Sequence, residues 1–363
     1  MGRHPGRDIV VVAASAGGLI PLRRFLSLLP ADLPASILVV LHIPATGGQA
    51  LPRILDRSGP LAASVPADGA KLAHGRVFVA PPDRHVLVVN GAVRLSRGPR
   101  QNGVRPAGDP LFRSAALYGG PRTVAVVLSG TLDDAALGSA VVEQCGGRVL
   151  VQDPAEAAYP GMPSSTLAAT RHAVSLPVDE LADHITQLAT ADADLVAEGL
   201  PAELERALRR EVSRLLDGDL EVNLAGHPYS GFSCPDCGGP LYFGREDDAL
   251  TYDCVVGHNW SPQSLLEGQS VAVERALWLA IRSLDERARL TTRLSDDALD
   301  RGRRMSAGHF RAAADEAWQA ADQIRKVVNG LLAMGTELDD PAGSGDSGVS
   351  GDSRVSGDSV PIE

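Results

Sequence analysis

The sequence predicts an α/β fold with a doubly wound, mostly parallel sheet, followed by a small cysteine-containing module and a helical hairpin. Three observations support this prediction. Short β-branched apolar runs alternate with helical patterns through residues 8–190, three cysteines cluster between positions 234 and 254, and two amphipathic stretches follow them. A chain of 363 residues is long enough for more than one domain.

The first domain is expected over residues 1–190. Its predicted strands cover 8–13, 36–41, 76–80, 85–89, 92–95, 123–129 and 147–151. Its predicted helices cover 18–29, 48–57, 109–119, 134–145, 164–170 and 178–188. Alternation with short links favours parallel pairing, but Asn90-Gly91 between two alternating runs indicates one antiparallel hairpin.

Four further segments are expected after residue 190. They are a helical linker at 191–222, a zinc-ribbon-like module at 223–262, an amphipathic helical region at 263–336 and a disordered tail at 337–363. Leu265, Leu279 and Leu290 contribute to an apolar stripe at helical spacing, which predicts a helix hairpin or a coiled coil. The tail repeats Ser, Gly and Asp and has too few large apolar residues to form a core.

Composition argues against several kinds of partner. The net charge of −11 disfavours non-specific binding to nucleic acid. No run of eighteen apolar residues predicts insertion into a membrane. The first eight residues lack the apolar core of a signal peptide, so a cytoplasmic protein is expected.

Three polar residues each follow a predicted strand: Ser15, His42 and Asp134. In a parallel sheet all three would lie at the carboxyl edge, where a histidine can activate a serine and a carboxylate can orient the histidine. Separately, Ser15 would more often belong to a phosphate-binding turn, His42 to the core edge and Asp134 to a helix cap. Spacing alone leaves the triad and the phosphate loop equally open.

Residues 8–188 resemble the catalytic domain of the chemotaxis protein-glutamate methylesterase family (CheB). The matching stretches occur in the family's order: Val-Val-Ala-Ala-Ser-Ala-Gly-Gly, Val-Leu-His-Ile-Pro, Val-Phe-Val-Ala-Pro-Pro-Asp-Arg-His, Arg-Pro-Ala-Gly-Asp-Pro-Leu-Phe-Arg-Ser-Ala-Ala, Leu-Ser-Gly-Thr-Leu-Asp-Asp and Tyr-Pro-Gly-Met-Pro. The resemblance implies that Ser15, His42 and Asp134 form the catalytic triad.

The same resemblance implies hydrolysis of glutamyl methyl esters on a methylated chemoreceptor-like protein, and glutamine deamidation in some members. The reaction that the resemblance implies requires no catalytic cofactor. A signalling kinase or a response regulator is a further expected partner. Because the resemblance begins at residue 8, the family's N-terminal receiver domain is expected to be absent, and control is expected to come from a partner or from the C-terminal half.

The matching motifs also suggest residues around the nucleophile. We expect Ala16, Thr131, His85, Arg113 and Met162 to contribute to the oxyanion site or to line the cleft. The alternatives for His85 and Arg113 are a buried hydrogen-bonded histidine and a surface ion pair.

The sequence departs from the family in the loop that carries the aspartate. The family's Gly-Met-Gly-x-Asp-Gly is Gly-Thr-Leu-Asp-Asp-Ala at residues 130–135. Loss of both later glycines could tighten or displace this loop. A catalytically weak module that docks receptor or histidine-kinase partners is therefore the alternative function.

The cysteine-containing module has the ligand pattern of a structural zinc site. Cys234 and Cys237 have two residues between them, and Cys254 and His258 follow with three residues between them. Three thiolates and one imidazole match a closed tetrahedral site. The alternative is three reduced cysteines without metal. The acidic run at 246–248 argues against nucleic acid as the module's partner.

Overall fold

The computed structural model describes residues 6–43, 50–191, 200–217, 224, 226–246 and 249–338. These residues belong to two compact units, Met1–Ser270 and Val271–Glu363. The predicted disordered tail lies outside the described residues, except for residues 337 and 338.

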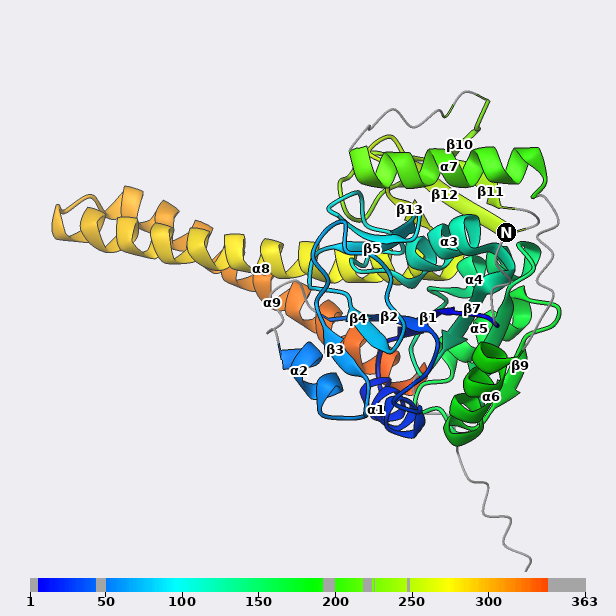
Figure 1. Cartoon of the computed structure of the whole chain (residues 1–363). Helices are drawn as coiled ribbons and strands as arrows, with labels where there is room; N and C mark the ends of the chain where they lie inside the picture. The colour runs from blue at the N-terminus through cyan, green and yellow to red at the C-terminus, as the bar shows by residue number, and fades with distance from the viewer. Residues whose placement is uncertain are drawn as a thin grey trace, which may run out of the picture. The chain divides into compact units, whose positions relative to one another are not determined.

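A seven-stranded parallel sheet forms the centre of the first unit (Figure 1). Its order is β3-β4-β2-β1-β7-β8-β9. The strands are β1 (Ile9–Ala14), β2 (Ser36–Leu41), β3 (Ala62–Ser64), β4 (Arg76–Val79), β7 (Thr123–Val127), β8 (Arg148–Gln152) and β9 (Val174–Leu176). The predicted doubly wound, mostly parallel sheet is confirmed.

Helices cover both faces of this sheet, as its uniformly apolar central strand requires. Alternate residues of β1 point to opposite sides, so that Val10 and Val12 belong to one core and Val11 and Ala13 to the other. The first core contains side chains from α1 (Leu19–Leu28), α2 (Ala50–Asp56) and α6 (Val178–Thr190). The second contains side chains from α3 (Gly108–Gly119), α4 (Ala136–Gln144) and α5 (Gly161–Ala169).

The predicted hairpin is present as β5 (His85–Val89) and β6 (Ala92–Ser96), which pair antiparallel in a separate two-stranded sheet. Asn90 and Gly91 have φ angles of +50° and +73°. Positive φ at both central residues is typical of the tight turn whose twist suits a hairpin. A short 3-10 helix, Gly120–Arg122, joins α3 to β7.

The first unit also includes part of the expected linker and the cysteine-containing module. Helix α7 (Ala202–Asp217) packs on α3 through the buried Leu208. A four-stranded antiparallel sheet follows. Its strands are β10 (Tyr229–Ser233), β11 (Pro240–Glu246), β12 (Ala249–Cys254) and β13 (Asn259–Trp260). The predicted linker is therefore partly an integral helix of the first unit.

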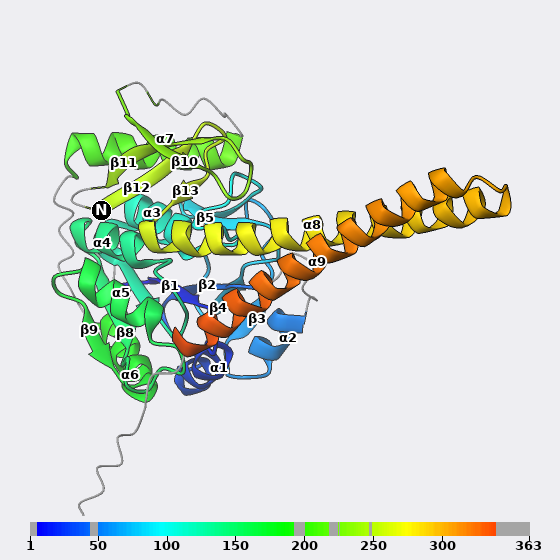
Figure 2. The same cartoon turned by 180° about the vertical axis from the view of Figure 1, so that it is seen from behind.

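The second unit contains a helix hairpin built from α8 (Pro262–Asp300), which begins in the first unit, and α9 (Arg304–Leu338) (Figure 2). Ser295 Oγ donates to the Ala307 carbonyl at 3.0 Å, and Arg325 contacts Asp285 at 2.6 Å. Beyond residue 270, the buried side chains that the structure describes on these two helices are mainly alanines, together with Ser295, Ile281 and Val328. Leu279 and Leu290 are more than half exposed, so that part of the stripe prediction is wrong.

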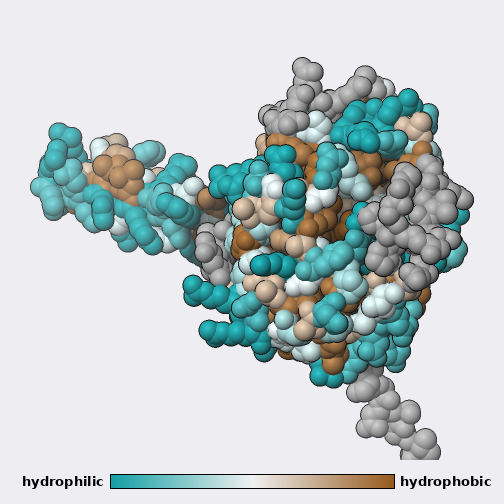
Figure 3. Space-filling model, in the orientation of Figure 1, coloured by the Kyte–Doolittle hydropathy of each residue, from teal (hydrophilic) through white to brown (hydrophobic). Residues whose placement is uncertain are grey.

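The face of the hairpin that Figure 3 shows is mostly hydrophilic, with a small apolar cluster near the tip. Leu299 and Met305 are exposed on either side of the turn between α8 and α9. None of the helices that the structure describes has the length and the apolar character that a bilayer span needs.

Candidate functional site

Ser15 and His42 lie side by side at the carboxyl edge of the sheet. The last residues of β1 and β2, Ala14 and Leu41, are register partners. The His42 amide donates to the Ala14 carbonyl at 3.0 Å, and the Ser15 amide donates to the Ser129 carbonyl at 3.0 Å. Ser15 is thus tied to the ends of two neighbouring strands, where open α/β sheets place their ligands and chemistry.

The third predicted residue, Asp134, binds the imidazole of His42. His42 Nε2 lies 2.8 Å from Asp134 Oδ2. The first amides of α3 also point at this carboxylate, with Gly108 N at 2.5 Å from Oδ2 and Asp109 N at 3.2 Å from Oδ1. A helix N-terminus stabilises negative charge at this position.

These contacts keep Asp134 ionised. Burial raises the pKa of the carboxyl, but the hydrogen bonds from His42 and from the Gly108 and Asp109 amides lower the pKa below its ordinary value. An ionised carboxylate only accepts hydrogen bonds, so His42 Nε2 carries a proton toward it. This leaves Nδ1 as the ring nitrogen that can accept a proton.

The serine and the imidazole share no hydrogen bond among the contacts of the described residues. The Ser15 side chain is partly exposed, and His42 is bound to Asp134. Hydrogen bonds of this kind are often long without substrate and shorten when it binds. The structure therefore brings His42 and Asp134 together and places Ser15 beside them on the same edge.

Gly130 packs against the serine, and Met162 packs against Gly130. The Met162 amide donates to the Gly130 carbonyl at 2.8 Å. A Cβ on Gly130 would lie 2.9 Å from Ser15 Cβ and would overlap Met162 Sδ. The side chain of Met162 is fully buried, so it supports the serine loop instead of lining an open cleft.

Ala16 and Thr131 lie in the two loops next to the serine. The Ala16 carbonyl accepts from Ser129 Oγ at 2.9 Å, while Thr131 is exposed. Two of the four residues that follow Thr131 adopt left-handed backbone conformations, with φ of +61° at Leu132 and +73° at Ala135. An oxyanion role for Ala16 and Thr131 stays a prediction.

His85 and Arg113, expected to line the cleft, are instead buried and bound to protein partners. His85 Nε2 donates to the Pro99 carbonyl at 3.0 Å, and Nδ1 accepts from the Ala107 amide at 3.3 Å. Arg113 donates to Glu211 on α7 at 2.9 Å. Both hold elements around α3, and neither faces a substrate cleft.

The buried His85 predicts a loss of stability in mild acid. Burial lowers the pKa of His85 from 6.5 to about 4, so the unfolded chain binds more protons between these pH values. This contribution is fully present above pH 6.5 and is lost as the pH falls to about 4, a change of about 3 kcal/mol in the free energy of unfolding.

Denaturant unfolding at several pH values checks this prediction. His85→Gln should be less stable at neutral pH but should show a flatter decline between pH 6.5 and 4. His172→Gln is the matched control, because the His172 side chain is 75% exposed. A decline of equal slope in the wild type and His85→Gln would contradict the assignment.

Asp133 has a role that sequence analysis missed. Its Oδ1 accepts hydrogen bonds from Ser261 Oγ at 2.9 Å and Ser264 Oγ at 2.8 Å. Ser261 Oγ also accepts from the Ser264 amide at 3.0 Å, which caps α8. Burial raises the pKa of Asp133. The pattern Ser-Pro-Gln-Ser at 261–264 could have indicated the helix start, but not its partner.

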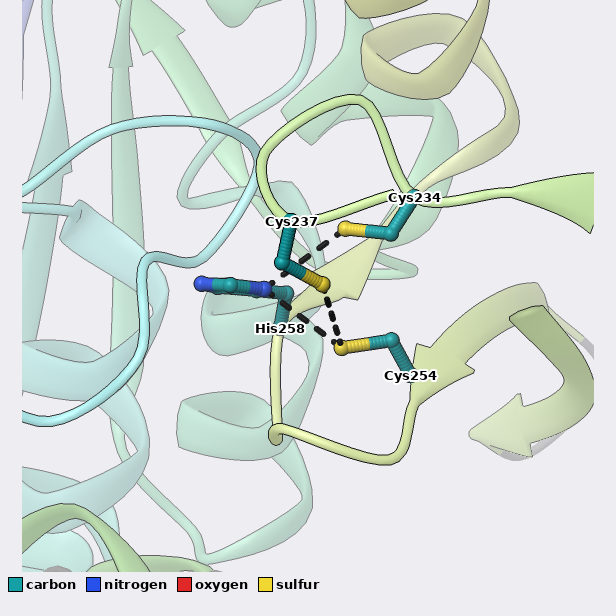
Figure 4. A group of neighbouring side chains, drawn as sticks. All are labelled: Cys234, Cys237, Cys254 and His258. Atoms are coloured by element: carbon teal, nitrogen blue, oxygen red, sulfur yellow. Dashed lines mark hydrogen bonds between the residues drawn. The ribbon is translucent and has the colours of Figure 1, made fainter. Parts of the chain in front are cut away.

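The predicted metal ligands form one cluster (Figure 4). Ligand atoms of Cys234, Cys237, Cys254 and His258 all lie within 4.8 Å of one another. Cys237 Sγ is 3.8 Å from Cys254 Sγ, and His258 Nδ1 is 3.5 Å from Cys234 Sγ and 3.4 Å from Cys254 Sγ.

These separations match the edges of a zinc tetrahedron. Bond lengths of about 2.3 Å to sulfur and about 2.0–2.1 Å to nitrogen give edges of about 3.8 Å between sulfurs and about 3.6 Å between sulfur and nitrogen. A hydrogen bond from Cys254 lowers the pKa of the Cys234 thiol to about 3, against the opposing effect of burial. The four residues can therefore hold a metal ion.

Comparison with known proteins identifies a family that the first half of the chain matches. The model of the CheB methylesterase family matches residues 10–185. A protein-glutamate methylesterase/protein-glutamine glutaminase of Anaeromyxobacter dehalogenans is 42% identical over 183 residues, which cover 50% of this chain and 54% of the relative. One of Myxococcus xanthus is 39% identical, covering 50% of this chain and 52% of the relative.

A solved structure matches the same part of the chain. The CheB methylesterase catalytic domain of Thermotoga maritima is 31% identical, with coverage of 50% of this chain and 98% of that chain and a TM-score of 0.47. The chain spans about half the length of the curated relatives it matches.

Proposed function

Because residues 10–185 belong to the CheB methylesterase family, we propose that this protein hydrolyses glutamyl methyl esters on a methylated chemoreceptor-like protein. Ser15 is the nucleophile, His42 the general base and Asp134 the residue that orients His42. The observation that supports these roles is the 2.8 Å contact between His42 Nε2 and a buried, ionised Asp134, at the strand end next to Ser15.

The chemistry follows from these positions. Ser15 Oγ attacks the ester carbonyl while His42 Nδ1 takes the hydroxyl proton. His42 returns that proton to the leaving methoxide, so methanol departs and an acyl-serine remains. Water, deprotonated by His42, then attacks the acyl-serine. His42 returns this proton to Ser15 Oγ as the ester bond breaks, which releases glutamate and the free serine. A glutamine side chain would follow the same steps with ammonia as the leaving group.

The cysteine–histidine cluster is proposed to hold a structural Zn²⁺. Cys234, Cys237, Cys254 and His258 would fill all four positions of a tetrahedral ion, so the metal would supply rigidity to the module. A signalling kinase or a response regulator is a further proposed partner, which would control the site.

Methanol release from methylated receptor protein, together with fluorophosphonate labelling, tests the proposal. Active protein should release methanol and carry the label on Ser15, and Ser15→Ala should do neither. Methanol release from Ser15→Ala at the wild-type rate would remove Ser15 from the mechanism.

The same experiment separates the alternative, a catalytically weak docking module. This reading is supported by the non-glycine residues Leu132 and Ala135 at left-handed φ beside the catalytic aspartate. It predicts a correctly folded protein that binds the receptor but neither labels nor releases methanol.

A further inference from the structure

We propose that Asn102 is a positioning residue, through which the metal-binding cluster holds the carboxylate of Asp134 in its catalytic position. This inference rests on the esterase function proposed above. It makes the cysteine-containing module a structural part of the active site, and it assigns the metal a role in keeping that site assembled.

Asn102 joins three parts of the first unit. Its backbone amide donates to the Asn259 carbonyl at 2.8 Å, and its side-chain Oδ1 accepts from the Ser261 backbone amide at 3.0 Å. Its Nδ2 donates to Asp109 Oδ2 at 3.2 Å. The residue is 8% exposed and has a φ of +51°, a conformation that Asn tolerates better than most residues.

Asp109 connects Asn102 to the catalytic carboxylate, because it binds Asn102 through its side chain and Asp134 through its backbone amide. Its backbone amide donates to Asp134 Oδ1 at 3.2 Å, and its Oδ1 accepts from the Gly138 amide at 2.6 Å. Asp109 thus clamps the starts of α3 and α4, which flank Asp134. Asn102 binds the other carboxylate oxygen of Asp109, which Arg113 also approaches at 3.8 Å, and so helps to fix the Asp109 side chain.

On its other side, Asn102 contacts the segment that follows the metal ligand His258. The His258 carbonyl accepts from the Cys254 amide at 3.0 Å, and the Gly257 carbonyl accepts from Gln101 Nε2 at 3.3 Å. A Cβ on Gly103 would lie 2.9 Å from the Trp260 ring, so the turn around Asn102 packs closely against this segment.

A second link reaches the same loop from the same segment. Ser261 and Ser264 both donate to Asp133, the residue immediately before Asp134. The aspartate pair is therefore held from two directions by residues within six positions of His258. Both links depend on where the module places residues 259–264.

The module has little besides its metal ligands to fix that segment. Its buried cluster, among the described residues, contains six residues, and two of them are ligands: Cys234, Leu241, Tyr252, Cys254, Trp260 and Leu265. A core of this size does not usually fold without a metal or disulfide. Loss of the ion should therefore release the contacts to Asn102 and Asp133.

Hydrogen–deuterium exchange on the full chain tests the link without relying on activity. The zinc-loaded chain is compared with the chelator-treated chain. Metal removal should speed exchange at the amides of residues 101–109 and 133–138, while the β1 amides stay protected. Unchanged exchange at 101–109 and 133–138 in metal-free protein would overturn the proposal, whether or not the chain is an esterase.

Asn102→Gly tests the residue itself, because glycine keeps the positive φ and removes both side-chain hydrogen bonds. It should retain one zinc per chain, lower kcat about tenfold and leave KM unchanged, since it displaces the catalytic carboxylate and not the substrate. Asn102→Gly should also speed exchange at the Asp109 amide.

Ser230→Ala is the matched control. Ser230 Oγ donates to the Leu241 carbonyl at 2.7 Å within the same module, away from Asn102. This variant should keep wild-type kcat and exchange. Equal kcat and equal Asp109 exchange in Asn102→Gly and Ser230→Ala would overturn the assignment. If the wild type itself releases no methanol, the proposed function fails, and the exchange comparison still decides the structural link.

Discussion

Replacing Asp134 by Asn should lower kcat for ester hydrolysis by about 10⁴-fold while the fold is retained. Both carboxylate oxygens accept hydrogen bonds: Oδ2 from His42 and Gly108, and Oδ1 from Asp109. An Asn offers one acceptor oxygen and one donor amide in their place.

Neither orientation of that Asn satisfies the site. With its oxygen toward His42, its NH₂ group would face the Asp109 amide, donor against donor. With the NH₂ toward His42, Nε2 would have to accept a hydrogen bond and Nδ1 would carry the ring proton. Nδ1 could then no longer take the hydroxyl proton of Ser15. Steady-state kinetics with methylated receptor, alongside circular dichroism, measures the effect.

Asp133→Asn is the matched control, since it removes the same charge one position away. An Asn oxygen can still accept from Ser261 and Ser264, so this variant should stay within about tenfold of the wild type. Comparable kcat values for Asp134→Asn and the wild type would show that Asp134 does not orient the base.

The sheet could be predicted from sequence because its central strands are buried on both faces. Strands β1, β2 and β7 are continuous apolar runs, which local patterning detects. Strands β3 and β9 have three residues each and partly exposed side chains, so they carry no such pattern. Their pairing with β4 and β8 is set by tertiary contact.

The predicted triad positions also follow from strand ends, since parallel strands deliver their carboxyl ends to one edge. The loop around Asp134 was harder to anticipate. Leu132 and Ala135 replace glycines of the family pattern, yet both adopt left-handed φ. This conformation costs a non-glycine residue about 1–2 kcal/mol, so the surrounding contacts keep the loop shape at some expense of stability.

The link between the module and the active site could not be read from sequence. Asp133 and its serine partners are separated by 128 and 131 positions, and no periodicity relates them. Asn102 carries no motif that indicates its three contacts. Sequence spacing predicted the cysteine–histidine cluster because its ligands pair locally, whereas its docking depends on shape and on partners distant in the chain.

Gly130→Ala should lower kcat by about 10²-fold, because the nucleophile is held against the position that the new methyl group would fill. The added Cβ would lie 2.9 Å from Ser15 Cβ, a separation that atoms of this kind do not adopt, and would overlap Met162 Sδ. Ser15 cannot swing away freely, since its amide is bound to Ser129. A displacement of about 1 Å at a reacting group costs about this much in rate.

A second substitution separates the two overlaps. Met162→Ala added to Gly130→Ala removes the sulfur and should restore part of the thermal stability, but kcat should stay low because the Ser15 overlap remains. Gly308→Ala on α9 serves as the control, since an added Cβ there would meet no atom within 4 Å apart from the neighbouring backbone of its own helix. Recovery of kcat in the double variant would instead mean that Gly130 acts through the packing of Met162, and that Ser15 tolerates a methyl group beside it.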